Sequence, residues 1–225
     1  MEFITLKNPN KNYFVVKSNK LIEAKYKLTL NEQRLILLLI SQINMKDEEF
    51  KDYVIKVSDL MDLFGLNNKN HYNIIKEVTL NLLSKPLSIP RETGVLHCNW
   101  ISSAEYFENE GCVKLCFDPK LKPYLLQLKN HFTTYGLDNV IRLKSTYAIR
   151  LYEILLKEYC YYSKKRINFI FSIKELKELL GIEKKEYPLF ANFKVKVLNV
   201  AEKELKGKSD FYFEYKTIKT GRAIT

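Results

Sequence analysis

The chain has 225 residues, a length that suits one large domain or two small ones. Its composition is 46% hydrophobic and 13% aromatic, which excludes a disordered chain, and no apolar run approaches the ~20 residues of a membrane-spanning helix. The formal net charge of +11 favours a polyanionic partner, either nucleic acid or an anionic membrane surface.

The first half of the sequence predicts three helices and a strand. "TLNEQRLILLLISQI" predicts a helix because Thr29 or Asn31 can cap it and a long apolar face follows. "DYVIKV" predicts a short strand. "SDLMDLFGL" predicts a short helix with Ser58 as its N-cap and Gly65 as its end, and "NHYNIIKEVTLNLLSKPL" predicts a third helix that ends before Pro86.

Strand signals follow the third helix. "LSIPRETGVLHCNWISSAEYF" turns at Glu92-Thr93-Gly94, and "GCVKLCF" follows a turn that ends at Gly111. The order helix, strand, helix, helix and β-hairpin is that of a winged helix, in which the third helix reads DNA and the hairpin is the wing.

The second half repeats this order. "STYAIRLYEILLKEYC" predicts a helix capped by Ser145, "INFIF" a strand, and "SIKELKELLGI" a helix ended by Gly181. "EYPLFANFKVKVLNVAEKEL" comes next, and "DFYFEYKTIKTGRAIT" predicts a hairpin that turns near Lys219-Thr220-Gly221.

A constant step of 116 residues relates the two halves. It connects two predicted caps, two arginines, two glycines and a set of apolar residues, namely Thr29 to Ser145, Arg34 to Arg150, Gly65 to Gly181, Leu35 to Leu151, Leu39 to Leu155, Val57 to Ile173, Leu60 to Leu176 and Leu63 to Leu179. We therefore expect an internal duplication. It predicts an α+β fold of two tandem winged-helix domains related by a pseudo-twofold, residues 1–138 and 139–225, with the boundary near residues 135–142.

The same step assigns the ambiguous stretch "NFKVKVLNVAEKEL" to a helix. Residues 71–84 map onto residues 187–200, so the alternation in "FKVKV" is the middle of a third helix and not a strand. On a helical wheel one face is apolar and consists of Phe190, Phe193, Val197, Ala201 and Leu205. The opposite face consists of Asn192, Lys196, Asn199 and Lys203, with Lys194 to one side.

The polar face of this helix has the chemistry of a DNA reader. Lysine can reach guanine O6 and N7 or a phosphate, and asparagine can pair with adenine N6 and N7. More lysines and an arginine flank the helix, at Lys184, Lys185, Lys206, Lys208, Lys216, Lys219 and Arg222. An ordinary solvated face is the competing interpretation.

The charge distribution favours DNA reading by the second domain. From Lys144 onward there are 18 Lys and Arg against 10 Asp and Glu, a net charge of +8. The first 143 residues hold the remaining 19 and 16, a net charge of +3.

The third helix of the first domain is less basic. Asn73 and Lys76 are its candidate DNA contacts, but Leu80 and Leu83 occupy the positions equivalent to Lys196 and Asn199. Two interpretations remain open: an exposed apolar interaction surface, or core residues seen in an imperfect register.

The cysteines give a weak metal signal. Cys112 and Cys116 share a face of a predicted strand, and His97 and Cys98 precede them. Their spacing is not that of a structural zinc site, so we interpret them as strand cysteines and expect no metal. The N-terminus does not have the layout of a signal peptide, so we expect a cytoplasmic protein with reduced thiols.

The sequence resembles the initiator Rep proteins of theta-replicating, iteron-containing plasmids. The matching segments run from about Val15 to Ile224, nearly the whole chain. They are "VVKSNKLIEAKYKLTLNEQRLILLLISQI", "FDPKLKPYLLQL", "FTTYGLDNVIRLKSTYAIRLYEILL", "LKELLGI", "FKVKVLNVAEKEL" and "KTGRAI". Family members usually continue beyond the point at which "GRAIT" ends this sequence, which leaves the last strand of the second hairpin open.

The resemblance implies a fold and a function. Such proteins have two winged-helix domains, bind the repeated origin sites (iterons) as monomers, help to open the origin and recruit the host helicase machinery. As homodimers joined mainly through the N-terminal domain, many repress their own gene. Their C-terminal third helix makes the main base contacts, which here corresponds to residues 192–203. Their N-terminal domain contributes more contacts to the DNA backbone.

Two other functions compete with this one. A rolling-circle nicking enzyme needs a His-x-His metal site, but His71, His97 and His131 are scattered, although Tyr161 and Tyr162 offer nucleophiles. A winged-helix transcriptional regulator without a replication role would use the same DNA chemistry. No Walker A motif occurs, so we expect no nucleotide cofactor and no enzymatic activity.

Overall fold

The first half of the chain folds into three helices packed against a mainly antiparallel sheet. The computed structural model describes residues 3–4, 13–66, 71–162, 168–220 and 223–224. The three helices are α2 (Leu30–Ser41), α3 (Val57–Phe64) and α4 (His71–Ser84). The sheet has the order β1 (Phe3–Ile4), β3 (Tyr53–Lys56), β7 (Cys112–Phe117) and β6 (Ile101–Phe107), with β1 parallel to β3 and the other pairs antiparallel.

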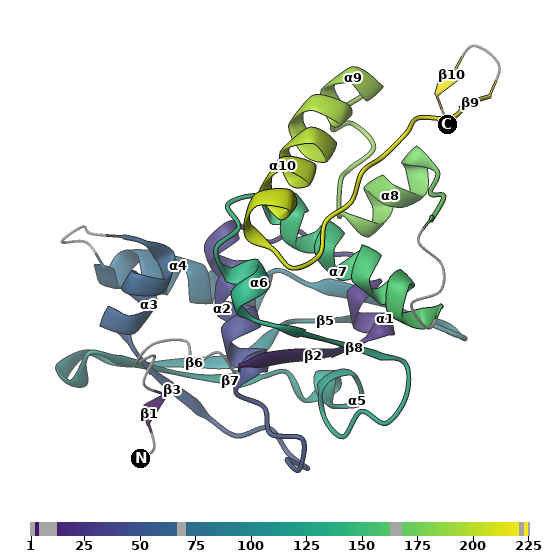
Figure 1. Cartoon of the computed structure of the whole chain (residues 1–225). Helices are drawn as coiled ribbons and strands as arrows, with labels where there is room; N and C mark the ends of the chain where they lie inside the picture. The colour runs from purple at the N-terminus through teal and green to yellow at the C-terminus, as the bar shows by residue number, and fades with distance from the viewer. Residues whose placement is uncertain (1–2, 5–12, 67–70, 163–167, 221–222, 225) are drawn as a thin grey trace.

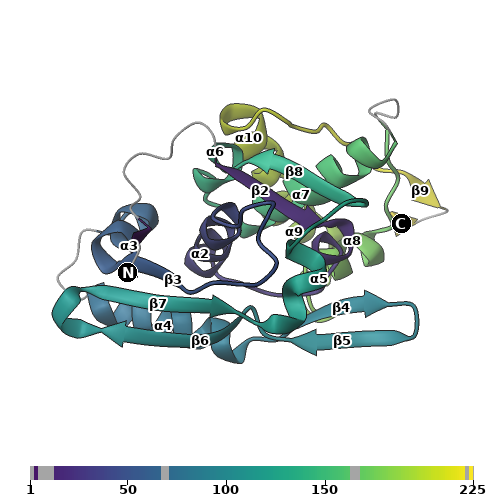
Figure 2. The same ribbon diagram turned by 90° about the horizontal axis from the view of Figure 1, so that it is seen from below.

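Helix α2 is the central element of the fold. Thr29 caps it in a capping box, in which the Thr29 side chain accepts from the Glu32 backbone and the Glu32 side chain accepts from the Thr29 N–H. Every residue from Leu35 to Ile40 is buried, so the helix is apolar all round. Figure 2 shows the reason: α2 lies between β3, β6 and β7 on one side and a second sheet, β2 and β8, on the other.

The second sheet is a long-range pairing that the sequence did not reveal. Strand β2 (Phe14–Ser18) pairs antiparallel with β8 (Phe132–Gly136), and Phe14 lies opposite Gly136. Three short helices flank this pair: α1 (Asn19–Ile22), α5 (Lys122–Leu125) and α6 (Asp138–Ile141). The pairing brings the start of the first domain against its end, just before the boundary with the second domain.

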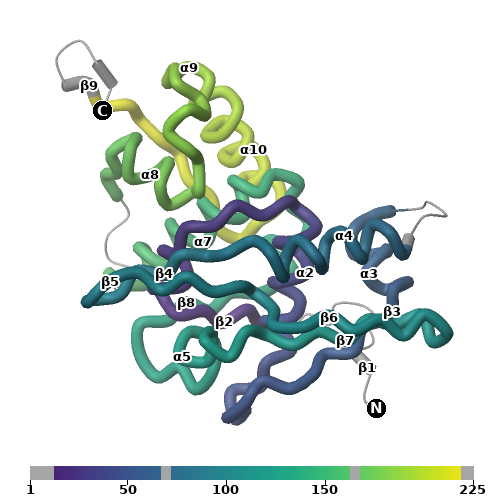
Figure 3. The backbone as a smooth tube through the Cα atoms, turned by 180° about the vertical axis from the view of Figure 1, so that it is seen from behind, coloured from purple at the N-terminus to yellow at the C-terminus, as the bar shows by residue number. Residues whose placement is uncertain are grey.

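Two hairpins follow α4, and the second of them is the wing of the first domain. Strands β4 (Leu87–Arg91) and β5 (Gly94–Cys98) turn at the predicted place but form a two-stranded sheet of their own. Strands β6 and β7 turn through a short 3-10 helix that ends at Gly111 in the left-handed conformation. The two hairpins extend in opposite directions from the body (Figure 3).

The second half consists mainly of helices. Helix α7 (Thr146–Tyr161) is capped by the Ser145 side chain, and α8 (Ile173–Leu179) by the Ser172 side chain. Helix α9 (Phe190–Phe193), a π-helical turn (Lys194–Leu198) and α10 (Asn199–Lys208) form one continuous rod beside α8 (Figure 1). The short strands β9 (Lys219–Thr220) and β10 (Ala223–Ile224) pair near the C-terminus.

Several sequence predictions are wrong in detail. Ser58 is not the N-cap of α3, because this helix begins at Val57 and has no side-chain cap. Asn31 is not the cap of α2, because Thr29 takes that role. The described part of "INFIF", residues 168–171, is not a strand. Residues 211–218 are extended without a partner strand, and the second hairpin is confined to β9 and β10.

The third helix of the second half is confirmed, but its position differs from the simple mapping. It was expected over residues 187–200 and is observed from Phe190 to Lys208. The rod therefore starts later and runs further than its counterpart α4.

The step of 116 residues has a physical basis in two equivalent arginines, the half-buried Arg34 and the buried Arg150. Gly65 and Gly181 both end a second helix with φ of 68°. Arg34 donates to the Leu63 carbonyl at 3.5 Å, and Arg150 donates to the Leu179 carbonyl at 3.0 Å. Leu63 and Leu179 are themselves 116 residues apart. Each domain therefore uses an arginine at the equivalent position to bind a carbonyl at the end of its second helix.

Each of these arginines also reaches into the other half of the chain. Arg34 donates to the Leu143 carbonyl at 3.1 Å, just before α7. Arg150 donates to the Ile22 and Ala24 carbonyls at 2.7 and 3.2 Å, a few residues before α2. Each arginine thus binds a backbone carbonyl of the opposite half, as a pseudo-twofold relation between the halves requires. These contacts fix the position of one half against the other.

The two equivalent glycines give a matched test of this contact. A Cβ atom on Gly181 would lie 2.2 Å from the Tyr26 carbonyl oxygen, whereas a Cβ atom on Gly65 would meet nothing within 4 Å. Gly65→Ala should cost about 1–2 kcal/mol for the left-handed backbone alone. Gly181→Ala should cost a further ~1–3 kcal/mol of overpacking. Urea unfolding measures both, and equal losses would contradict the close approach of Tyr26.

Candidate nucleic-acid interface

The rod formed by α9, the π-helical turn and α10 has one face in the core and one face outward. Phe193, Val197, Ala201 and Leu205 are buried, and Phe190 is partly buried, as the wheel predicted. The predicted polar face is exposed at every position, namely Asn192, Lys194, Lys196, Asn199 and Lys203. The structure therefore confirms the helical interpretation, and the contact of these side chains with DNA stays a prediction.

The π-helical turn was not predicted. It spans Lys194–Leu198 and includes Lys194 and Lys196, two of the candidate base contacts. Such turns insert one extra residue and are frequent at functional sites. A wheel drawn at 100° per residue has no signal for it, because the apolar residues on both sides of the turn still face the core.

The rod is held firmly against the rest of the second domain. The Glu204 carboxylate on α10 accepts from the Lys144 and Ser145 backbone N–H groups, at 2.8 and 3.1 Å, where α7 begins. Lys177 on α8 donates to the Tyr187 carbonyl at 2.6 Å, just before the rod. The exposed face is thus presented on a fixed support, which a base-reading surface needs.

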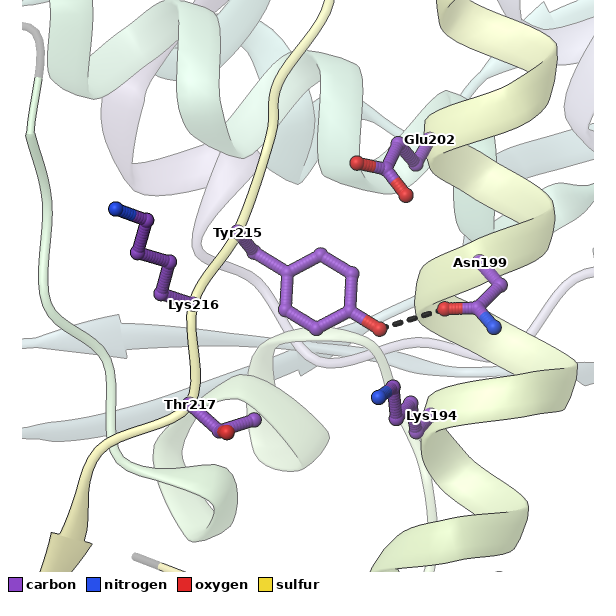
Figure 4. Close-up of a pocket in the computed structure, with 6 residues that line it drawn as sticks. All are labelled: Lys194, Asn199, Glu202, Tyr215, Lys216 and Thr217. Carbon is purple, nitrogen blue, oxygen red and sulfur yellow. Dashed lines mark hydrogen bonds between the residues drawn. The ribbon is translucent and has the colours of Figure 1, made fainter.

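An open groove lies between the rod and residues 211–218, which we call the return segment. Six residues line it: Lys194, Asn199, Glu202, Tyr215, Lys216 and Thr217. Figure 4 shows the Tyr215 ring extending from the return segment toward the rod. Its hydroxyl donates to Asn199 Oδ1 at 2.6 Å.

The groove contains three residues that sequence reasoning missed as candidates: Glu202, Tyr215 and Thr217. Burial, and then the nearby Glu202 carboxylate, raise the pKa of the Tyr215 hydroxyl above its ordinary value, so Tyr215 stays a hydrogen-bond donor at neutral pH. Aromatic residues occupy every second position at the start of the return segment, which predicted a strand. No sequence pattern predicted that this segment lies against α10.

The flanking basic residues fall into three groups. Lys184, Lys185 and Lys216 are exposed, and Lys216 lines the groove. Lys206 lies 3.6 Å from the Glu214 carboxylate and Lys208 lies 3.9 Å from the Glu204 carboxylate, so part of their charge is compensated. Lys219 belongs to β9, but its side chain and all of Arg222 lie outside the described residues.

The equivalent surface of the first domain is more acidic. Asn73 and Lys76 are exposed on α4, as predicted. The tip of the wing carries Glu108 and Glu110, and it lies beside the start of α4, where the Tyr72 hydroxyl donates to the Glu108 carbonyl at 3.3 Å. These carboxylates repel phosphates, so this surface should contribute less to DNA affinity than the rod.

The two leucines on α4 differ from each other. Leu80 is 47% exposed, whereas Leu83 is half-buried and packs against the core. The two interpretations left open by the sequence therefore each describe one residue, and no continuous apolar stripe is formed by this pair.

A buried charge cluster joins α7 to the first half of the chain. Lys17 Nζ lies 2.6 Å from Glu153 Oε1, and Arg150 Nη1 lies 3.0 Å from Glu153 Oε2. The Tyr135 hydroxyl also donates to Glu153, and Arg150 donates to the Tyr26 hydroxyl at 2.6 Å. The cluster joins β2, β8 and α7. Separating these three elements would leave buried charges without their partners, which is energetically costly.

The cluster fixes the ionisation of its carboxylate. Burial alone would raise the pKa of the Glu153 carboxyl, but the charges of Lys17 and Arg150 outweigh burial and hold the pKa below its ordinary value of 4.5. Glu153 is therefore a carboxylate at neutral pH and compensates two buried cations.

The cysteines and histidines do not assemble as metal ligands. Among the residues that the structure describes, no three His, Cys, Asp or Glu side chains come together in this way. Burial raises the pKa of the Cys98 thiol to about 11, which disfavours the thiolate that zinc needs. His97 is instead hydrogen-bonded to Ser88, with 2.9 Å between Nδ1 and Oγ.

Comparison with known proteins identifies the family. Residues 14–156 match the family model described as initiator replication protein, WH1, and residues 172–225 match the model described as initiator Rep protein, WH2. The chain belongs to the initiator Rep protein family. It is accordingly a replication initiator built from two winged-helix domains, as the repeat and the resemblance predicted.

Individual relatives agree with this assignment. The PI protein of Escherichia coli is 30% identical over an alignment of 258 residues that covers 100% of this chain and 84% of the relative. A replication initiation protein of E. coli is 27% identical, and the match covers 85% of this chain and 61% of that protein. The crystal structure of the Pi initiator protein in complex with iteron DNA aligns with a TM-score of 0.73 at 26% identity, covering 96% of this chain and 95% of that one.

In the described part of the chain, no helix is both long and apolar enough to cross a membrane.

Glu153→Gln should destabilise the initiator in a pH-dependent way. At neutral pH it leaves Lys17 and Arg150 without their counter-charge, at a cost of ~3–5 kcal/mol. Because the folded-state pKa of Glu153 lies below 4.5, its stabilisation is complete above that pH and is lost as the pH falls through the folded-state pKa. The difference from the parent in urea unfolding should therefore shrink below pH 4.5. Glu178→Gln, in an exposed pair with Lys25, is the control and should lose far less.

Lys196→Ala should weaken binding to the specific DNA site. A lysine that reads a base contributes ~1–3 kcal/mol of discrimination, whereas one that contacts phosphate weakens all sequences alike. Lys51→Ala removes the same charge from the loop before β3 and serves as control. Fluorescence anisotropy with specific and scrambled duplexes separates these cases, and no difference between the two variants would remove this face from the site.

Proposed function

We propose that this initiator binds directly repeated sites, the iterons, in the replication origin of its plasmid, and that the exposed face of the α9–α10 rod makes the main base contacts. The observation that carries the proposal is this rod: a helix of the length and polarity that enters a major groove, with five exposed Asn and Lys side chains on a rigid support. The likeness to the Pi initiator, which was crystallised with iteron DNA, supports it.

The proposal assigns different tasks to the two domains. The rod of the second domain reads base edges, and Lys184, Lys185 and Lys216 contact nearby phosphates. In the first domain, Asn73 and Lys76 on α4 contact the DNA backbone next to the acidic wing tip. The buried cluster around Glu153 keeps the two contacts at a fixed spacing, so that one chain covers one repeat as a monomer.

Regulation and recruitment extend the proposal. We infer that two chains associate as a dimer through the first domain, that this dimer represses the initiator's own gene, and that the DNA-bound monomer opens the origin and recruits the host helicase. The resemblance to plasmid Rep initiators supports this division. Analytical ultracentrifugation with and without iteron DNA tests it: the free chain should contain dimers that convert to monomers on DNA, and dimers on a single repeat would contradict it.

We further propose that initiation by this chain involves no catalysis by the chain itself. The histidine that could have joined a metal site, His97, is bonded to Ser88, and Tyr161 and Tyr162 pack against each other with ring centroids 5.2 Å apart. Incubation with supercoiled origin DNA and Mg²⁺ or Mn²⁺ should leave the DNA uncut. A nicked product with a covalent phosphotyrosyl adduct would contradict this part.

A footprint on the DNA flanking the gene tests the central part of the proposal. Protection should appear at evenly spaced direct repeats, and an inverted repeat near the promoter should be protected when the dimer is present. A plasmid whose replication does not depend on this gene, with protection confined to an operator, would favour a transcriptional regulator.

Binding to the repeats should fall steeply with salt. Each phosphate that a lysine neutralises contributes about 0.9 to the slope of log K against log salt. The parent should therefore lose affinity by orders of magnitude between low and physiological salt. Lys184→Ala should reduce the slope of log K against log salt by about 0.9, the contribution of one phosphate contact. A flat salt response of the parent would contradict binding through the basic face.

A further inference from the structure

A single carboxylate lies within the basic reading surface. Glu202 lines the groove together with Lys194, Asn199 and Lys216, and it lies one helical turn from Asn199 on the rod. DNA phosphates repel a carboxylate, so its position costs affinity for every sequence. A carboxylate can offset this cost by accepting a hydrogen bond from the amino group of cytosine, the base edge that favours Glu and Asp.

The neighbouring asparagine has its amide held in one orientation by Tyr215. The Tyr215 hydroxyl donates to Asn199 Oδ1 at 2.6 Å, which turns the amide nitrogen of Asn199 away from the ring (Figure 4). An asparagine that pairs with adenine needs both its oxygen and its nitrogen. The hydrogen bond from Tyr215 occupies one of the two lone pairs of the Asn199 oxygen and holds that oxygen toward the ring, so the amide nitrogen is the end of the side chain that is left to meet a base. Its donors fit the acceptors guanine O6 and N7 or thymine O4.

The return segment keeps Tyr215 in place. The Tyr152 hydroxyl on α7 donates to the Asp210 carboxylate at 2.9 Å, and the Phe211 ring packs edge-on against Tyr152. The Phe213 ring packs beside Tyr215, with 6.2 Å between their centroids. The segment therefore approaches the rod from an anchored start.

We propose that this groove reads one G·C base pair of the iteron: Asn199 donates to guanine O6 or N7, Glu202 accepts from cytosine N4, and Tyr215 is the positioning residue that orients Asn199. This rests on the proposed function, because it specifies the base pair that the rod recognises. Lys194 lies on the guanine side of the groove, where it adds a second donor.

The donor pattern of the two base pairs distinguishes them at this site. In the major groove a G·C pair presents two adjacent acceptors and then the cytosine donor at the end. An A·T pair presents its donor, adenine N6, between the acceptors N7 and O4, with the thymine methyl group beyond. A carboxylate that approached adenine N6 would face acceptor lone pairs on both sides, so Glu202 favours cytosine.

Base-preference profiles of the full chain test this assignment. The parent, Glu202→Gln and Glu214→Gln would each be titrated with iteron duplexes in which every base pair is changed in turn. Glu202→Gln should lose about tenfold of its discrimination at one C·G position, while its affinity for scrambled duplex rises because a negative charge is gone.

The control removes the same charge from a carboxylate outside the groove. Glu214 lies on the return segment beside Lys206. Glu214→Gln should raise affinity for all duplexes and leave the profile unchanged. If Glu202→Gln behaves as Glu214→Gln does, Glu202 does not read cytosine and the inference is overturned.

Tyr215→Phe tests the positioning role, because it keeps the ring and removes the hydroxyl that holds Asn199. Its profile should become more tolerant of adenine at the adjacent position, since the Asn199 amide can then turn to present both its oxygen and its nitrogen to a base. An unchanged profile would overturn this role. A parent with no preference for the repeats over scrambled DNA would instead contradict the proposed function, so the two failures are distinguishable.

Discussion

The structure depends on the buried guanidinium of Arg150. It binds the Ile22 and Ala24 carbonyls of the segment before α2, the Leu179 carbonyl at the end of α8, the Tyr26 hydroxyl and the Glu153 carboxylate, and it lies 4.2 Å from the centre of the Tyr26 ring. A charge buried in this way is stable when its partners stay in place and costly when one is lost. The two domains are therefore joined by a contact that specifies one arrangement.

This constraint fixes the position of the rod at one end of the molecule relative to α4 at the other. Arg34 makes the equivalent contacts in the first domain, and both arginines reach across to the opposite half. The support of the rod continues through Glu204 to the start of α7, which carries Arg150 itself. Rigid placement of side chains on such a support reduces the ordering cost of binding, which favours discrimination between base pairs.

Much of this was predictable, and the failures have physical causes. The Thr29 and Ser145 caps, the two left-handed glycines and the split between Phe193 and Lys196 depend on local patterns that a sequence contains. The pairing of β2 with β8 joins segments more than a hundred residues apart, which no local pattern specifies. Phe211, Phe213 and Tyr215 alternate because the return segment is extended and packs with one side against the domain, and alternation alone does not tell this from a ladder of strands. Glu202 has no distinguishing pattern in the sequence, because its place in the groove depends on the return segment and Tyr215.

The central claim is that the outward face of the α9–α10 rod lies in the major groove of an origin repeat while α4 approaches the backbone of the same repeat. A crystal or cryo-EM structure of the chain bound to a single repeat tests this most directly. The account predicts Asn199 and Lys196 within hydrogen-bond distance of base edges, and a cluster around Glu153 with unchanged partners. A complex in which the rod faces solvent and the DNA lies against another surface would contradict it.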